Sequence, residues 1–428
     1  MFERLLPALV AVVALAPGPP AAAQTGSAPA PLERLTFEEA VKRATDRHPT
    51  VGQAAQAILR AEALLDQARS VFRPSVYGLV GTTILDAARA FDGNITQPRT
   101  QSTFNATLSY PFLAAARWAA KTQAADQVET ARISAEETRR QVALAAAESY
   151  LAVVAAQRQR DIAVRNRDTA RALADYSRAR LAAGQGSRLN HVRSSQELAA
   201  AEGLVQTAEL ALRQAQEALG VAVFAEGPVA ANGDPKMPFA TPPSDGDSWL
   251  TQRPDVRLST AEVRAADRVV SDSWKSWLPI GTASLTPQYV TPAGLFEPAK
   301  TWRAAFQLQV PIYDGTLGAT KRVKVADFES AKLRLDAVKV QARSELRIAQ
   351  EAVTRREQIA ATSRQAAESA VEALHITEIA YRAGATSNIE VVQAQQAARN
   401  LETVSALAED RLRQARLDLL VAMGQFPQ

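Results

Sequence analysis

The feature that most constrains the fold is a pair of very long segments without helix breakers. Residues 115–183 and 316–383 contain no proline, and their only glycine is Gly318, in the first turn of the second segment. At 1.5 Å per residue, about 69 helical residues form a rod of roughly 100 Å. A lone helix of that length has no core to fold onto, so both rods are expected to need lateral partners.

The first rod carries a heptad repeat of small residues. Counting by sevens from Val128 reaches Ser177 mainly through alanine, and a companion series that begins at Ala131 has polar breaks at Gln159 and Asn166. Small residues let helix backbones approach closely, whereas a two-stranded coiled coil would carry Leu and Ile at these positions. The pattern therefore favours a helix that has neighbours on both sides, as in a helical wall.

The chain contains two copies of one unit, because five landmarks recur in the same order with offsets of 205, 205, 200, 200 and 200 residues. Such ordered self-similarity is the mark of a duplicated structural unit. The matched pairs are His48-Pro49-Thr50-Val51 with Arg253-Pro254-Asp255-Val256, Phe72-Arg73-Pro74 with Trp277-Leu278-Pro279, Ser109-Tyr110-Pro111-Phe112 with Gln309-Val310-Pro311-Ile312, Leu181-Ala182-Ala183-Gly184 with Tyr381-Arg382-Ala383-Gly384, and Leu212-Arg213-Gln214-Ala215 with Leu412-Arg413-Gln414-Ala415.

These landmarks divide the chain into regions. Residues 24–222 form the first predicted repeat, residues 223–248 a linker rich in Pro, Gly and Asp, and residues 249–428 the second repeat. Each repeat is expected to contain a helix (residues 36–71 in the first copy), two strands joined by a polar loop, a rod, a glycine turn and a returning helix of about 35 residues.

The strands are indicated by alternation of apolar and polar residues. Strands near residues 103–112 and 302–312 show the pattern best, while their partners, residues 74–84 and 279–290, alternate less cleanly. Strands of about ten residues with one apolar and one polar face are typical of a barrel in lipid. The alternative is a soluble hairpin packed on a core. The barrel hypothesis predicts that the lipid-facing residues include Phe104, Leu108, Trp302, Phe306 and Leu308.

The N-terminus, residues 1–23, has the pattern of a secretory signal peptide. Arg4 supplies the charge, residues 5–16 the apolar stretch, and Ala21-Ala22-Ala23 the cleavage site. No other stretch approaches 18 uninterrupted apolar residues, so a membrane-spanning mature chain would have to use strands. The sequence has no cysteine, which excludes disulfides, thiol catalysis, cysteine-ligated metal and an N-terminal lipid anchor on cysteine.

Nothing in the sequence indicates catalysis or nucleic-acid binding. The net charge of +4 arises from basic and acidic residues interleaved along helices, which is typical of solvated helix faces. The three histidines are scattered singly, so no metal site is expected. No phosphate-binding loop, nucleophile elbow or metalloprotease helix occurs, so no cofactor is expected and an exported hydrolase is disfavoured. Gly184-Gln185-Gly186 is interpreted as a turn that ends a helix.

Four strands and four helical rods per chain leave open edges, because barrel closure needs about eight or more strands. A closed ring of identical subunits would solve both problems, and three chains would supply twelve strands and twelve rods.

With these features the chain resembles the TolC family of outer-membrane efflux proteins, from Leu35 to Gly424. The resemblance is carried by the duplication and by three segments, Leu35-Thr36-Phe37-Glu38-Glu39-Ala40, Gln252-Arg253-Pro254-Asp255-Val256 and Tyr381-Arg382-Ala383-Gly384. It implies a mixed α and β membrane protein, a homotrimer whose twelve-stranded outer-membrane barrel continues as a long periplasmic α-helical barrel. It also implies docking onto a periplasmic adaptor and an inner-membrane transporter, and no enzymatic activity.

The same resemblance suggests functions for the glycine turns. Gly184, Gln185, Gly384 and Ala385 would form the tips that meet the adaptor. Glu390, Gln393 and Asn190 would line the periplasmic constriction of the duct. Equally, Glu390 could be an exposed charge favoured by the dipole at a helix N-terminus.

The sequence thus favours a passive exit duct for an efflux pump or a type I secretion system in the outer membrane. The alternative is a soluble periplasmic coiled-coil protein with a structural or chaperone role. The cargo, whether drugs, metal ions, peptides or proteins, is left open.

Overall fold

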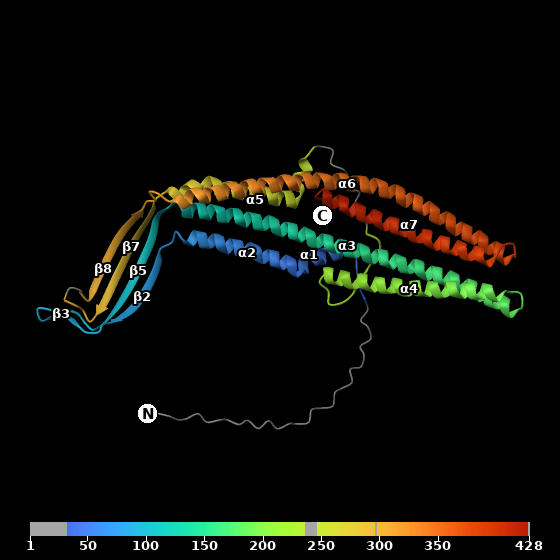
Figure 1. Cartoon of the computed structure of the whole chain (residues 1–428), viewed down its shortest axis with the longest axis horizontal. Helices are drawn as coiled ribbons and strands as arrows, with labels where there is room; N and C mark the ends of the chain where they lie inside the picture. The colour runs from blue at the N-terminus through green and yellow to red at the C-terminus, as the bar shows by residue number, and fades with distance from the viewer. Residues whose placement is uncertain (1–31, 236–245, 296–297, 427–428) are drawn as a thin grey trace, which may run out of the picture.

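The structure, a computed structural model, describes residues 32–235, 246–295 and 298–426. The molecule is elongated, with a curved sheet at one end and helices along the rest of its length (Figure 1). The signal peptide predicted at residues 1–23 and residues 236–245 of the predicted linker lie outside the described residues.

The main sheet combines strands from both repeats. Strands β2 (Ser75–Ile84), β5 (Thr100–Ala114), β7 (Ile280–Thr291) and β8 (Lys300–Gln309) pair antiparallel in the order β2-β5-β7-β8. Strand β8 ends earlier than the alternation suggested, before Pro311, which has no N–H to donate to a strand ladder. The loop between β2 and β5 folds into a small hairpin of β3 (Arg89–Phe91) and β4 (Asn94–Gln97).

The pairing register separates the sheet into two faces, because residues paired directly across strands share a face. Phe104 pairs with Val80 and Tyr289, and Leu108 pairs with Val76 and Leu285. The face that they define, called the apolar face below, contains Val76, Gly78, Val80, Thr82 and Ile84 of β2, Ser102, Phe104, Ala106, Leu108 and Tyr110 of β5, Ala283, Leu285, Pro287 and Tyr289 of β7, and Lys300, Trp302, Ala304, Phe306 and Leu308 of β8.

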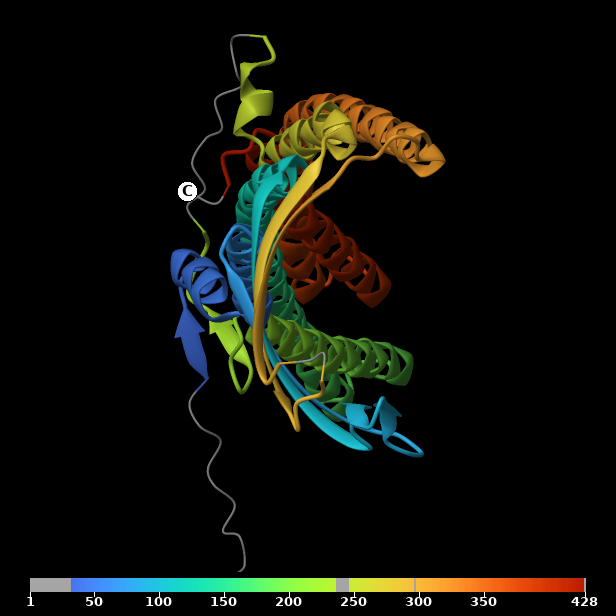
Figure 2. The ribbon, with the colours of Figure 1, turned by 90° about the vertical axis from the view of Figure 1, so that its left-hand side faces the viewer.

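The opposite face, called the polar face, is rich in hydroxyl and amide groups. On the central strand β5 its side chains are half-buried, whereas Phe104, Leu108 and Tyr110 of the apolar face are exposed. This difference is expected if the sheet curves toward its polar face, and Figure 2 shows the sheet as an arc. The members of the polar face include Thr103, Asn105, Thr107, Ser109, Thr282, Ser284, Thr286, Gln288, Thr301, Arg303 and Gln307.

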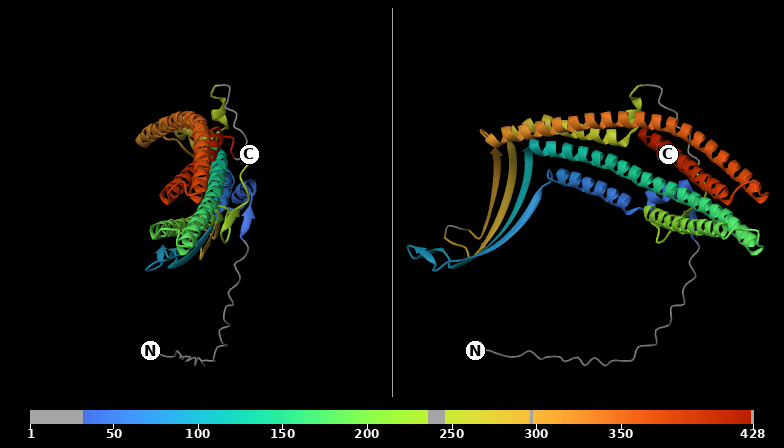
Figure 3. Two further views of the ribbon diagram at one scale, coloured as in Figure 1. Left: turned by 90° about the vertical axis from the view of Figure 1, so that its right-hand side faces the viewer. Right: turned by 45° about the vertical axis from the view of Figure 1, so that its right-hand side comes forward.

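The long helices repeat the order of the strands. Helices α2 (Pro49–Ser70), α3 (Ala115–Ala182), α5 (Pro254–Ser271) and α6 (Gly315–Arg382) contact one another in the order α2-α3-α5-α6, and each adjoins one strand of the sheet along the chain. The returning helices α4 (Arg188–Ala222) and α7 (Asn388–Ala422) pack as hairpins on α3 and α6. Viewed along the long axis, the helices form an arc with α6 at one edge and α4 at the other (Figure 3).

The helix expected over residues 36–71 is interrupted. Helix α1 (Phe37–Arg47) ends at His48, whose backbone is extended, and α2 begins at Pro49. Proline lacks an N–H and disfavours helical geometry in the residue before it, so the chain turns at this point. Helix α1 starts with a capping box, in which Thr36 and Glu39 each accept a hydrogen bond from the backbone of the other. In the second copy, η1 (Ser248–Gln252) precedes α5 and η2 (Asp272–Trp277) follows it.

Part of the predicted linker is ordered and packed. Strand β6 (Val229–Ala231) pairs in parallel with β1 (Glu33–Leu35), and all three β6 residues are buried. With α1, these strands form a collar on the convex side of the helical arc (Figure 2). The collar shares a core with α3 and α4, to which Tyr150, Val153 and Leu219 belong. Apolar strand residues that can be buried against a rod explain why this segment does not remain a loop.

A buried arginine joins four segments of the second repeat. Arg253, only 5% exposed, makes two hydrogen bonds to the carboxylate of Asp255 and one each to the Glu345 carboxylate and the Ala422 carbonyl. Burial alone would raise the pKa of Asp255, but hydrogen bonds and charge attraction to Arg253 outweigh it and hold that pKa below its usual range. The buried guanidinium is thus paired with carboxylates and hydrogen-bonded to a carbonyl, as a buried charge requires.

We predict that Arg253→Ala will lower the free energy of unfolding by about 3–5 kcal/mol, because it leaves the partly buried carboxylate of Asp255 unpaired. The matched control is Arg257→Ala one turn later, where the side chain is exposed and pairs with Glu136. That loss should cost at most about 1 kcal/mol. Guanidinium chloride unfolding in detergent, followed by helical circular dichroism at fixed protein concentration, measures both. Equal losses for the two variants would contradict this account of Arg253.

Candidate functional site

Two hairpin turns stand at the end of the molecule opposite the sheet (Figure 1). Gly184 and Gly384 adopt left-handed backbone angles, with φ of +71° and +79°. Beyond each glycine a backbone N–H reaches back across the helix end, from Gln185 to Arg180 at 2.9 Å and from Ala385 to Ala380 at 2.8 Å. Both turns are therefore Schellman motifs, which use glycine because other residues resist this conformation. The predicted helix-ending role of these glycines is confirmed.

Aromatic side chains bind the two hairpins together just behind the turns. Tyr381 of α6 is buried and meets Tyr176 of α3 edge to face, with ring centroids 5.7 Å apart. The Arg180 guanidinium lies 5.9 Å and 6.0 Å from the centroids of these two rings. Val391 of α7 is fully buried in the same cluster. The tips of the two repeats are thus held in a fixed relation within one chain.

The structure places the three predicted constriction residues at this end of the molecule. Glu390 and Gln393 are exposed on the first turns of α7, and Asn190 is half-buried on the first turn of α4. Among the described residues, Glu390 has no ion-pair partner. Asn388 beside it is buried, and its amide donates to the Tyr381 hydroxyl at 3.4 Å. The backbone of α7 is therefore anchored while the Glu390 side chain is free to project.

A second link between the hairpins was not foreseen from the sequence. Glu197 of α4 is only 8% exposed and accepts hydrogen bonds from Arg399 and, at 3.0 Å, from Gln396, both on α7. The position that corresponds to Glu197 in the second repeat is Ala397, so the internal repeat contains no signal for this contact. Only the spatial proximity of α4 and α7 reveals it.

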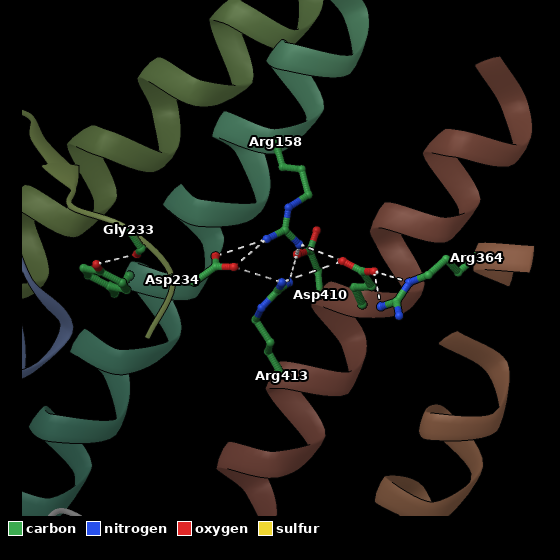
Figure 4. Close-up of polar contacts among 8 residues, drawn as sticks. Arg158, Gly233, Asp234, Arg364, Asp410 and Arg413 are labelled. Atoms are coloured by element: carbon green, nitrogen blue, oxygen red, sulfur yellow. Dashed lines mark hydrogen bonds and ion pairs between the residues drawn. The ribbon is translucent and has the colours of Figure 1, made fainter. Parts of the chain in front are cut away.

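A larger charge network lies where the collar meets the rods (Figure 4). Arg158 of α3 contacts Asp234, which follows β6, at 3.1 Å and Asp410 of α7 at 2.9 Å. Arg413 of α7 contacts the same two carboxylates at 3.3 Å and 2.7 Å. The network continues from Glu409 to Arg364 of α6 at 2.6 Å, and the nearby Tyr150 hydroxyl donates to the Gly233 carbonyl at 2.9 Å.

This network is electrically balanced, with three guanidinium groups and three carboxylates. Burial raises the pKa of Asp410, although the charges of Arg158 and Arg413 act to lower it. The network fastens the segment between the repeats to both α3 and α7, so it serves assembly of the chain rather than chemistry. No nucleophile lies beside a base in it, and no group of three or more His, Asp or Glu in the described part of the chain is placed to hold a metal ion.

None of the described helices combines the length and the apolar character needed to cross a bilayer. The five residues predicted to face lipid all lie on the apolar face of the sheet, Phe104 and Leu108 on β5 and Trp302, Phe306 and Leu308 on β8. All five are exposed in the single chain, Phe306 most of all at 82%.

The described residues thus form a curved antiparallel sheet that continues into long paired helices. The sequence matches the Outer membrane efflux protein family over residues 40–223 and 247–425, and the chain belongs to this family. No match to a curated protein was found.

Solved structures with the same fold include outer-membrane channels from several bacteria. The outer membrane protein VceC of Vibrio cholerae has a TM-score of 0.75 and 16% identity, covering 91% of this chain and 96% of that one. The CmeC outer membrane channel of Campylobacter jejuni has a TM-score of 0.79 and 16% identity, covering 92% and 87%. A membrane protein from Pseudomonas aeruginosa has a TM-score of 0.80 and 18% identity, covering 92% and 91%.

These findings confirm the predicted family and the predicted function class. The protein is an outer-membrane efflux channel, an exit duct rather than an enzyme. The alternative of a soluble periplasmic coiled-coil protein is not supported.

Proposed function

We propose that three copies of this chain close into a ring that forms a continuous duct from the periplasm through the outer membrane. The observation that carries the proposal is the shared order of strands and helices, β2-β5-β7-β8 and α2-α3-α5-α6, with both series open at both ends. Unpaired edge strands cannot face lipid, because their backbone groups would lack hydrogen-bond partners. In a ring, β8 of one subunit pairs with β2 of the next and removes every edge.

In this assembly the apolar face of the sheet is the lipid face. Ten residues at about 3.4 Å each, tilted by about 40°, span about 25 Å, which matches the apolar band of outer-membrane barrels. Phe104, Leu108, Trp302, Phe306 and Leu308 would then contact lipid. The polar face, with its hydroxyl and amide groups, would line a wet lumen.

The helical part closes in the same way. The helices at the two edges of the arc (Figure 3) carry exposed apolar side chains, which a neighbouring subunit could cover. They are Leu59 and Leu64 of α2, Leu204 and Leu210 of α4, and Val340, Ile348, Ile359 and Ile376 of α6. Burying such side chains is the main favourable term in association.

The duct would work as the outer component of a tripartite efflux pump or a type I secretion system. Family proteins are channels of tripartite efflux pumps, with a periplasmic adaptor and an inner-membrane transporter as partners. Here the tips at Gly184, Gln185, Gly384 and Ala385 would meet the adaptor, and the transporter would supply the energy. The signal peptide at residues 1–23 would direct export, and the repeats would span residues 24–222 and 249–428 around the linker at 223–248.

The constriction would lie at the tips, where threefold symmetry brings three copies of Glu390 toward one axis. Gln393, one turn further along α7, and Asn190, at the equivalent position of α4, would add polar but uncharged groups. Three carboxylates around a narrow opening favour cations and repel anions, and salt screens the effect.

Engineered cysteines test the ring, and the natural chain offers no background because it has none. We expect Val80→Cys on β2 combined with Ala304→Cys on β8 to give, with a short bis-maleimide in mild detergent, a ladder that stops at three chains. In the control pair, Val76→Cys on β2 and Leu108→Cys on β5, the two cysteines are paired neighbours within one chain. Their cross-link stays inside the chain and should give no ladder. A monomer without cross-links, or a ladder that continues past three, would refute the trimer.

The two faces of the sheet can be tested on adjacent residues of one strand. Phe306→Arg places a charge on the apolar face and should cost about 2–4 kcal/mol near the bilayer midplane. Gln307→Arg places the same charge on the polar face and should leave the folded barrel intact. Heat-modifiable oligomers in isolated outer membranes report folding of each variant. If Phe306→Arg folds and Gln307→Arg does not, the faces have been assigned in reverse.

Single-channel recording tests the constriction. At low salt, Glu390→Gln should reduce the preference for cations, because it removes three negative charges from the narrowest ring. Glu372→Gln removes an exposed carboxylate on α6, farther from the turn, and should change little. An unaltered cation preference in Glu390→Gln would mean that Glu390 is only a solvated helix residue.

A further inference from the structure

The strands of the main sheet carry almost no charge. Of all residues in β2, β5, β7 and β8, only Lys300 and Arg303 are ionisable to a charged form at neutral pH, and both belong to the edge strand β8. Lys300 is the first residue of β8, next to the loop. Arg303 lies inside the strand, three residues further along, an odd spacing that places its side chain on the opposite face. The position of a guanidinium in the middle of a strand, in a sheet with almost no other charge, needs a physical explanation.

The register places the two charges on different faces. Lys300 pairs with Tyr289 on the apolar face, at its outer end. Arg303 pairs with Thr286 on the polar face, and the Thr286 hydroxyl in turn lies 3.2 Å from that of Thr107. The surroundings of Arg303 are therefore hydroxyl and amide groups, which solvate a cation without neutralising it.

No carboxylate is available to Arg303 from the sheet. None of the four strands contains Asp or Glu, and within the described ranges no residue forms an ion pair with Arg303. Closing the ring would bring β2 of the next subunit beside β8, and β2 has no acidic residue either. The exposed guanidinium thus keeps its charge unpaired on the face that would line the lumen.

We propose that Arg303 is an anion-selecting residue of the duct, present as a ring of three positive charges inside the barrel. This inference rests on the proposed trimeric duct. The ligands that it fits are small anions and the carboxylate or phosphate groups of passing cargo, because a guanidinium presents paired N–H donors that match these groups. Rings of arginine or lysine are a general means of favouring anions in pores.

The radius of the pore, compared with the Debye length, decides at which salt concentrations such a ring affects passing ions. Twelve strands spaced by about 4.8 Å and tilted by about 40° give a backbone radius of about 12 Å. The Debye length is about 30 Å at 0.01 M salt and about 3 Å at 1 M salt. Three charges on the wall therefore influence the whole cross-section at 0.01 M and only the wall itself at 1 M.

The Arg303 ring and the Glu390 ring would lie at opposite ends of the duct, one in the sheet and one at the tips. The arginine ring favours anions and the glutamate ring favours cations, so both rings together set the ion selectivity of the whole duct. Each must therefore be tested by the change that its own variant causes rather than by the sign of the total.

The test is the reversal potential of single channels in planar bilayers under a KCl gradient near 0.01 M. Arg303→Gln should shift the chloride-to-potassium permeability ratio toward potassium by about twofold or more, and Arg303→Lys should retain most of the natural ratio. Lys300→Gln, with its charge on the other face and next to the loop, is the matched control and should shift the ratio clearly less than Arg303→Gln. All differences should disappear at 1 M KCl.

The outcomes separate this inference from the proposed function. If the natural protein forms no channel, the proposed duct itself fails. If channels form and Arg303→Gln leaves the ratio unaltered at low salt, Arg303 does not select ions and the inference is wrong. If Lys300→Gln shifts the ratio as much as Arg303→Gln, the effect comes from general charge and the inference is equally wrong. Repeating the measurement in the Glu390→Gln background should give the same shift for Arg303→Gln.

Discussion

The backbone groups on the outer edges of β2 and β8 are the groups on which the architecture depends. In lipid an unsatisfied N–H or C=O costs several kcal/mol, so a four-stranded sheet cannot remain open there. Each strand adjoins a long helix along the chain, and the helices keep the order of the strands. Closing the sheet therefore closes the helical arc as well. In the proposed ring, one hydrogen-bonding requirement in the membrane would thus set the geometry of a helical wall that extends far outside it.

At equivalent positions, the two repeats pack different pairs of residues against each other. In the second repeat, Arg253 lies against Gly424, where an added Cβ would sit 3.2 Å from the arginine Cγ. In the first repeat, the matching positions hold His48 and Phe224, whose rings meet edge to face at 6.5 Å. Phe224 takes a left-handed φ of +52° at the helix end where Gly424 takes +73°. The small residue accompanies the large cation, and the aromatic pair takes the place of both, so the two residues at each site fit each other.

Periodicity predicted those parts of the structure that are governed by local rules. Alternation in the strands located Phe104 and Phe306 on one face, because strand geometry leaves only two faces to choose from. Glycine after a long helix predicted the tips, because the left-handed position favours it. The break at His48 was not predicted, although it too follows a local rule, because Pro49 disfavours helical geometry in the residue before it. The buried strand β6 and the Glu197–Arg399 contact depend instead on what lies nearby in space. The heptad series also drifts, since Ala145 and Ala152 are exposed while Tyr150 and Val153 are buried, as a helix of 3.6 residues per turn must drift against a repeat of seven.

The distribution of charged side chains bears on what the duct can select. In the proposed barrel, a wide wall lined by hydroxyl and amide groups would have little means of recognising cargo, because solutes would pass it through water. In the proposed ring, selection would act where charge is unpaired and is either concentrated by symmetry or close to the axis. Most arginines of the helical part are paired with carboxylates, as Arg158 and Arg413 are beside the collar. Arg303 in the sheet and Glu390 at the tip are unpaired among the described residues. If the proposed roles of these two residues hold, changes at either would alter what the duct admits without altering how it assembles.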